Sequence, residues 1–376
     1  MNRFTNILFA ILLSAIAGCT TEFVPDSEVT GETLVVEGMI TDQNRVNRIR
    51  LARSQPIGEM LNNKVPVTGA VVTVTDDDGT VTTLTETAPG TYCTDSVLFR
   101  GRVGASYSLR ALLGGREYET DFMEMKPVPP IDSLYYEKVM INNASDTINI
   151  DEGARIFADA LDPTGECRFY RWDYTETWEY RIPYAVTKRV CYITERSDRI
   201  LIKNTTPYSQ AKVTRYPVTY ITHETDRLKE RYSILLRQYS LNEQEYNFWE
   251  RVSDVSQNVG NLYDVTPSVI RGNIRSCTDQ EEIVLGYFSV SAVSEKRLFI
   301  KDHFYGLPHF FTYCATDTLG GALPSTGFET DYWVIEDYSD EIPPFWIITT
   351  YKECADCTIR GSSEMPSFWR DYLRDK

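Results

Sequence analysis

The sequence has 376 residues, with 38 basic and 54 acidic side chains and a formal net charge of −16 at pH 7. This acidic balance leaves no basic patch and so excludes nucleic acid as a partner on electrostatic grounds. Aromatic residues make up 12% of the chain and include 24 tyrosines, a composition that favours partly exposed β-sheets.

The first predicted element is an export signal at residues 1–18. Arg3 precedes an uncharged segment, Phe4–Ala17, and small residues stand directly before Cys19. A basic residue, a short apolar segment and a small-residue cleavage site are typical of a secretory signal. The segment is too short for a membrane-spanning helix, which needs about 20 apolar residues.

The residues Ile16–Cys19 (IAGC) resemble the lipobox of bacterial lipoproteins, whose cysteine receives diacylglycerol and an N-acyl chain. The alternative is an ordinary secretory signal in which Cys19 is incidental. The resemblance implies a lipid anchor on Cys19, and several acyl chains make such an anchor stable. Thr20, in place of an aspartate, is similar to lipoproteins sorted to the outer membrane, on either its periplasmic or its cell-surface face.

A polar tether over residues 19–32 precedes a first predicted domain at residues 33–126. Some seven short segments of β character follow one another there, with turns that contain glycine. Strands at this spacing predict a β-sandwich. The segment resembles the immunoglobulin-like and transthyretin-like modules of exported proteins.

Three prolines within Lys126–Ile131 predict a stiff connector, because proline cannot lie in a central strand. A second, larger and β-rich domain is therefore expected at residues 131–376. Segments 285–293 and 297–300 are predicted to pair as strands, and 332–335 and 345–351 to form two more. One amphipathic helix is also expected. Ser240 is its predicted cap, Glu243 the capping-box partner and Gly260 the residue that ends it. Its apolar stripe consists of Phe248, Val252, Val255 and Val259.

Alternating aromatic residues mark the segment 170–180 as the candidate ligand-binding face. In a strand, alternate side chains share one face. The face would hold the even-numbered residues, among them Tyr170, Trp172, Tyr174, Glu176 and Trp178. Flat rings beside a carboxylate suit a sugar or a peptide, whereas the alternative is a core-facing sheet surface with its polar groups at the rim.

Seven cysteines remain besides Cys19, an odd number in a compartment that permits disulfides. Cys354 and Cys357 are candidates for a disulfide with each other or with Cys277 or Cys314. Metal binding would need a second ligand pair, which the histidines do not supply. We therefore expect no metal and no cofactor.

Catalytic motifs are absent from the sequence. His223-Glu224 begins like a zinc-protease motif, but Arg227 occupies the position of the second histidine. Asp76–Gly79 is interpreted as a hairpin turn and not as a calcium loop. The sequence therefore indicates a protein that is not an enzyme.

Several segments along the chain resemble one lipoprotein family of the Bacteroidota, listed as domain of unknown function 4249. They include 34–38, 66–76, 127–136, 237–241, 285–288 and 354–361. The resemblance implies a non-catalytic accessory subunit of a TonB-dependent receptor uptake system, with binding or scaffolding as its role. The alternative is a stand-alone surface lipoprotein that binds a glycan or a peptide.

Overall fold

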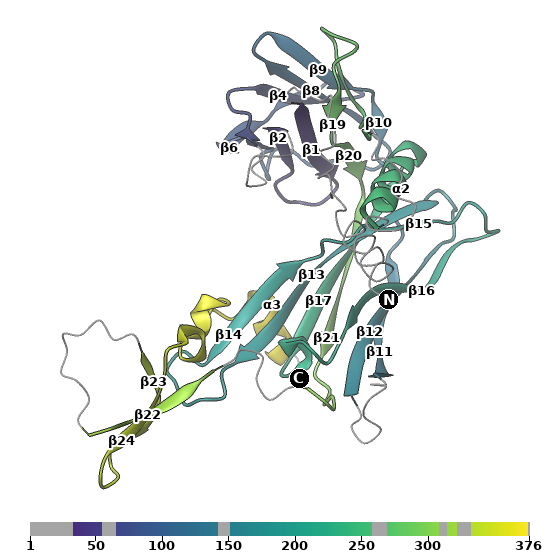
Figure 1. Ribbon diagram of the computed structural model, residues 1–376. Coiled ribbons are helices and arrows are strands. Elements are labelled where there is room, and N and C mark those ends of the chain that lie inside the picture. The colour runs from purple at the N-terminus through teal and green to yellow at the C-terminus, as the bar shows by residue number, and fades with distance from the viewer. Residues whose placement is uncertain are drawn as a thin grey trace, which may run out of the picture.

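The computed structural model describes residues 33–54, 65–141, 151–257, 269–307, 314–321 and 332–374. Cys19, the export signal, the tether, Val259 and Gly260 lie outside these ranges. The described chain is mainly β, as the sequence predicts, and its strands form five sheets (Figure 1). None of its helices has the length and apolar character needed to cross a membrane.

Two sheets that share one hydrophobic core form the first unit, here called the two-sheet unit. Alternation explains the core: in β4, Val72 and Val74 are fully buried while Val71 is exposed. One sheet contains β1 (Leu34–Thr41), β2 (Arg48–Arg53), β3 (Val65–Pro66), β6 (Thr85–Ala88), β7 (Thr91–Cys93), β19 (Val284–Leu285) and β20 (Phe288–Ser291). The other contains β4 (Val71–Asp76), β5 (Val81–Thr83), β8 (Ser106–Leu113), β9 (Arg116–Thr120), β10 (Met123–Glu124) and β18 (Ile274–Ser276).

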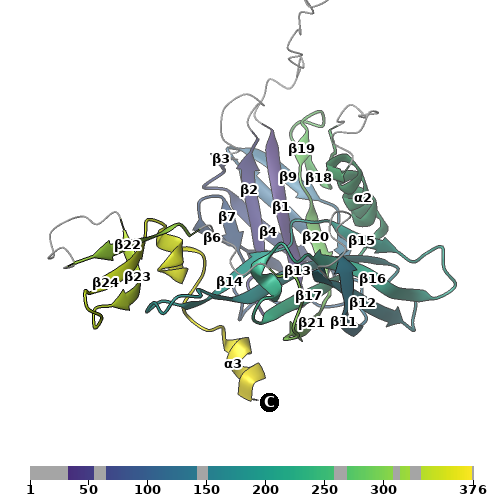
Figure 2. The same ribbon diagram turned by 60° about the horizontal axis from the view of Figure 1, so that its bottom comes forward.

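Three strands of the two-sheet unit come from a distant part of the chain. β20 pairs in parallel with β1, and β18 pairs with β9 (Figure 2). The predicted pairing of segments 285–293 and 297–300 is therefore wrong. Phe288 is fully buried in the core of the two-sheet unit. Local alternation identified a strand there, but it carries no information about a partner some 250 residues away.

A second unit follows the proline connector and consists of two further sheets around their own core. The three-stranded sheet contains β11 (Ile131–Ile141), β12 (Asp151–Asp162) and β16 (Ala211–Ile221). The five-stranded sheet contains β13 (Phe169–Arg181), β14 (Val190–Arg196), β15 (Leu201–Asn204), β17 (Tyr232–Leu241) and β21 (Val293–Ile300). A short 3₁₀ helix, η1 (Asp226–Leu228), precedes β17.

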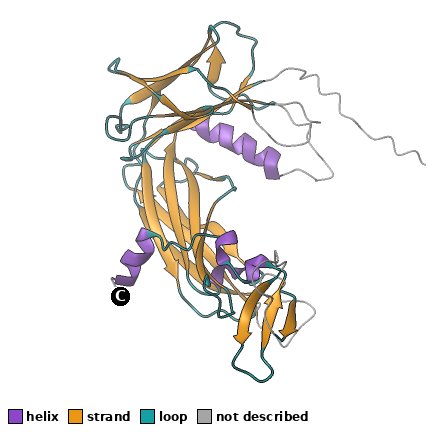
Figure 3. Ribbon diagram, turned by 90° about the vertical axis from the view of Figure 1, so that its left-hand side faces the viewer, coloured by secondary structure: helices purple, strands orange, loops and turns teal. Residues whose placement is uncertain are grey.

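Helix α2 (Glu243–Gln257) lies where the two units meet (Figure 3). Its cap is Asn242, whose Oδ1 accepts a hydrogen bond from the Glu245 amide at 2.8 Å. The predicted cap, Ser240, is wrong, because Ser240 is buried in β17 and donates to the Lys126 carbonyl at 2.6 Å. Phe248 packs into the core of the two-sheet unit, while Tyr246 packs on Phe169 of the second unit.

A small three-stranded sheet, here called the arm, lies at the end of the molecule away from the two-sheet unit (Figures 1 and 3). Its strands are β22 (Thr316–Gly320), β23 (Trp333–Tyr338) and β24 (Phe345–Thr349), so the strands predicted at 332–335 and 345–351 are confirmed. Two 3₁₀ helices, η2 (Lys352–Cys354) and η3 (Cys357–Ile359), and the helix α3 (Ser367–Arg374) follow.

Candidate functional site

The aromatic face of β13 lies in the core of the second unit. Tyr170, Trp172, Tyr174 and Trp178 are all buried, with Trp172 at 1% exposure. The three-stranded sheet covers them: the rings of Trp172 and Tyr216 stack with centroids 4.3 Å apart. A sugar or peptide cannot reach these rings while the two sheets remain packed.

Glu176, the carboxylate on the same face, is also buried and has partners. Both of its oxygens accept hydrogen bonds from Arg227, at 3.1 and 3.2 Å, and Tyr232 donates to one of them at 2.8 Å. This network satisfies a charge that would be costly to bury alone. Arg227, the residue that rules out a zinc-protease motif, is thus the partner of Glu176. The face that the sequence marks for ligand binding is instead a core surface with one internal ion pair.

On the opposite face of β13, side chains contact α2 and the neighbouring strand β17 of the same sheet. The Arg171 guanidinium lies 3.9 Å from the Trp249 ring centre, and Asp173 accepts hydrogen bonds from Arg237 and Tyr239. Both faces of this strand are therefore engaged in packing.

Two disulfides join parts of the chain that the sequence could not pair. Cys354 bonds with Cys314, which was one of the expected alternatives. Cys357 bonds with Cys191 of β14, a partner that the sequence analysis did not consider. Cys277 is exposed and carries a free thiol. The spacing of cysteines gave no signal for Cys191, since 166 residues separate it from Cys357.

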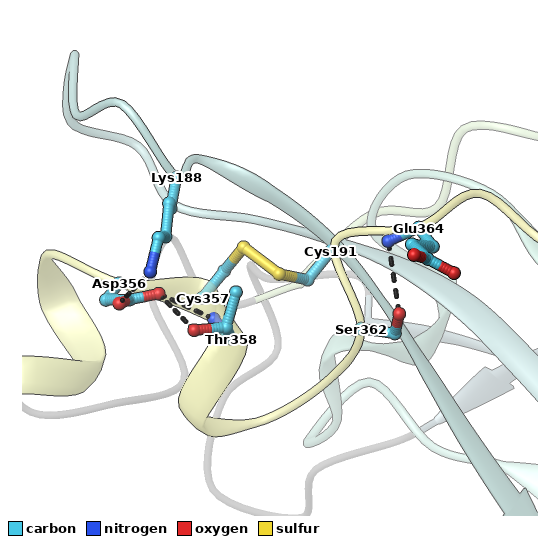
Figure 4. The surroundings of a disulfide bond; sticks show 7 residues. All are labelled: Lys188, Cys191, Asp356, Cys357, Thr358, Ser362 and Glu364. Atoms are coloured by element: carbon cyan, nitrogen blue, oxygen red, sulfur yellow. Dashed lines mark hydrogen bonds and ion pairs between the residues drawn. A yellow bond between two sulfur atoms is a disulfide. The ribbon is translucent and has the colours of Figure 1, made fainter.

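The Cys191–Cys357 disulfide holds the segment after the arm against the edge of the five-stranded sheet. Around it, Lys188 forms an ion pair with Asp356 at 3.0 Å, and Asp356 accepts hydrogen bonds from Thr358 (Figure 4). These contacts hold the pKa of Asp356 at about 2, mainly through the Thr358 hydroxyl. The carboxylate is therefore charged at neutral pH, and an ion pair as well as a disulfide holds this segment against the five-stranded sheet.

At the tip of the arm, the hairpin between β23 and β24 presents apolar side chains to solvent. Ile342 is 97% exposed, and the rings of Tyr338 and Phe345 stack 4.6 Å apart. The tip of the arm thus exposes one aliphatic side chain beside a pair of partly exposed aromatic rings.

Glu117, Glu119 and Cys277 lie with their ligand atoms within 4.8 Å of one another. Each carboxylate already forms an ion pair, Glu117 with Arg110 at 2.6 Å and Glu119 with Arg275 at 2.7 Å. Burial and the neighbouring Glu119 charge raise the pKa of the Cys277 thiol, which keeps it protonated. These residues fit a surface ion network better than a metal site, which requires a thiolate.

A cavity of about 310 Å³ lies beside α2 and was not predicted from the sequence. One face of the helix contributes Gln244, Asn247, Phe248 and Arg251, at helical spacing. The other lining residues are Asp121, Met123, Arg271, Gly272, Asn273 and Tyr287. The apolar stripe of the helix predicted how it packs against the core. The polar residues between the apolar ones were the part of the sequence that could have indicated a cavity beside the helix.

Comparison with known families gives one match. The family model described as Domain of unknown function (DUF4249) matches residues 20–297, which covers both units as far as β21. A search of the curated proteins finds no match.

Proposed function

We propose that this chain, a member of the DUF4249 family, is a non-catalytic outer-membrane lipoprotein that serves as an accessory binding or scaffolding subunit of a TonB-dependent receptor uptake system. The observation that carries the proposal is the arm. It stands at the far end of the β framework, is held to the five-stranded sheet through the Cys191–Cys357 disulfide and exposes apolar side chains at its tip.

The disulfides support an exported location. Such bonds form and persist outside the cytosol, whereas cytosolic thiols are kept reduced. The Cys191–Cys357 and Cys314–Cys354 bonds therefore agree with the export signal and lipobox that the sequence predicts.

A lipid on Cys19 would hold the protein close to a membrane-embedded partner. Thirteen residues lie between Cys19 and Thr33, where the described chain begins, so fourteen Cα–Cα steps join the two (33 − 19 = 14). Fully extended, they reach at most about 50 Å. Such a tether raises the effective concentration of the arm near a receptor, so that a weak contact is sufficient for association.

Purification from detergent-solubilised membranes tests the proposal. We expect the wild-type protein to carry fatty acid on Cys19 by mass spectrometry and to co-purify with an outer-membrane receptor. Cys19→Ser should lose the fatty acid and leave the membrane fraction, while Cys277→Ser should behave like the wild type. A native protein without fatty acid, or one that purifies without any receptor, would refute the proposal.

The alternative is a stand-alone surface lipoprotein that binds a glycan or a peptide. Burial of the β13 face removes the surface on which that alternative was based. A soluble ligand that co-purifies in the absence of a receptor would favour it.

A further inference from the structure

We propose that the cavity beside α2 binds a small organic anion, whose carboxylate or phosphate group is held by Arg251 and Arg271. The inference rests on the lining of the cavity alone and does not depend on the proposed membrane role. It would hold equally for a protein that acts without a receptor.

Charge is the first argument. Arg251 projects from α2 and Arg271 precedes β18, both are exposed, and neither forms an ion pair with any residue that the structure describes. Arg251 Nε donates to the Asn247 carbonyl of its own helix at 3.2 Å, which leaves its two terminal nitrogens available to a ligand. Two such guanidinium groups at one cavity are notable in a chain with a net charge of −16. Arginine presents paired N–H donors that match the geometry of carboxylate and phosphate.

Asp121 is the acidic residue among those that line the cavity. It already forms an ion pair with Arg275 at 2.6 Å, and Arg275 also pairs with Glu119. Arg275 therefore balances one of these two carboxylates. Among the described residues that line the cavity, two arginines face one aspartate, so the net charge that a ligand meets is positive.

Hydrogen-bond donors on the helical wall give the second argument. Gln244 and Asn247 line the cavity on the same face of α2 as Arg251. Their carboxamide N–H groups can donate to the oxygens of an anion that the arginines hold.

The wall opposite the helix is held in place by backbone contacts. The Asn273 side chain forms two hydrogen bonds with the Phe288 backbone, at 2.8 and 2.9 Å. Gly272 approaches Gly286 so closely that a Cβ on Gly272 would lie 1.6 Å from the Gly286 carbonyl oxygen. The Phe248 and Tyr287 rings, 4.8 Å apart, join this wall to α2. A cavity built this way is formed before the ligand arrives, which reduces the entropic cost of binding.

Size defines the class of ligand. A volume of about 310 Å³ is at the lower end for ligand pockets. It fits a short dicarboxylate or a sugar phosphate, and it is too small for a polysaccharide or a folded partner.

Isothermal titration calorimetry on the detergent-purified full chain tests the proposal with two matched pairs of probes. Succinate is compared with succinamide, and glucose 6-phosphate with glucose. We expect saturable binding of at least one anion and none of its neutral counterpart. The anion that binds tells whether carboxylate or phosphate is the preferred group.

Variants locate the binding site. Arg251→Gln and Arg271→Gln should each weaken anion binding by about tenfold or more, because each removes a charge-assisted contact. Arg370→Gln, an exposed arginine on α3, is the control and should leave the dissociation constant unchanged.

Three outcomes would overturn the proposal. In the first, neither anion shows saturable binding. In the second, an anion and its neutral counterpart bind equally well. In the third, Arg251→Gln and Arg271→Gln both have dissociation constants within about a factor of two of the wild type. Circular dichroism of each variant confirms that a loss of affinity is not a loss of fold.

Discussion

Two glutamates in the interior show how differently this protein treats a buried carboxylate. Glu176 has Arg227 and Tyr232 as partners, and both of its oxygens are satisfied. Glu245, on α2, accepts hydrogen bonds from Ser289 at 2.5 Å and Trp249 at 3.2 Å with one oxygen only. Its other oxygen has no partner among the described residues. Burial raises the pKa of Glu245, and the hydrogen bond from Ser289 and the charge of Arg171 oppose this effect only in part.

We therefore predict that Glu245 makes stability depend on pH. Because its pKa is higher in the folded protein than in the unfolded chain, the folded state binds the proton more tightly. The stabilisation is fully present below 4.5, the ordinary pKa of a glutamate, and is lost as the pH rises through the pKa of Glu245 in the folded protein. Glu245→Gln should thus raise the free energy of unfolding at about pH 8 and change it little at about pH 4.

Urea unfolding at several pH values measures this difference. Glu281→Gln, an exposed glutamate, serves as the control and should show a difference that does not vary with pH. If Glu245→Gln is less stable than the wild type at about pH 8, its carboxylate has a partner that the structure does not show.

At the scale of the element, the sequence predicts the existence of α2 and of β23 and β24, but not how they are fixed. Asn242 and Ser240 are both good caps by residue type, and only the pairing of β17 with β13 and β21 shows that Ser240 belongs to a strand. Period-two alternation likewise predicts that Tyr170 and Trp172 share a face. It cannot show that β12 and β16 lie above that face and remove it from solvent.

The arm is the element whose stability is most directly testable. The Cys314–Cys354 disulfide joins the residues before β22 and after β24 and spans 40 residues, and the chain-entropy model assigns about 4 kcal/mol to a loop of this length. We predict that Cys314→Ser/Cys354→Ser loosens the arm, so that chymotrypsin cleaves at its aromatic residues well before it cleaves elsewhere. Mass spectrometry of the first fragments identifies these sites.

Cys277→Ser, which removes a free exposed thiol, is the control for this experiment and should be cleaved at the wild-type rate. If the double variant resists chymotrypsin as well as the wild type does, the strand pairing of the arm alone suffices to hold it.

At the scale of the whole molecule, the two-sheet unit is not a continuous segment of sequence. Ile274, Phe288 and Val290 belong to its core, although the chain has by then passed through most of the second unit. We therefore predict that residues 33–130 expressed alone remain unfolded, with the exposed edge of β1 prone to aggregation. Near-ultraviolet circular dichroism and amide-proton dispersion in NMR spectra measure this outcome.

The matched variant fuses residues 269–297 to the same fragment through a flexible linker. It should recover cooperative unfolding, because it restores β18, β19 and β20 to the two sheets. A fragment 33–130 that folds cooperatively by itself would show that these strands are dispensable.

The sequence thus predicted the mainly β class and many of the strands, because alternation and turn residues are local signals. It did not reveal the return of β18–β20 to the first unit, the Cys191–Cys357 bond or the cavity beside α2. Each of these depends on which residues meet after folding. No local sequence pattern around Cys191 or Tyr287 indicates which distant residues they contact in the folded protein.

The return of β18–β20 also dictates when the first unit can be completed. Between Met125 and Ser291 the ribosome must add 166 residues (291 − 125 = 166). At about 5–20 residues per second, this takes roughly 8 to 33 s. Throughout that interval the segments of β1 and β9 lack their partners β20 and β18. We therefore expect the nascent chain to depend on a holding chaperone to avoid misassembly.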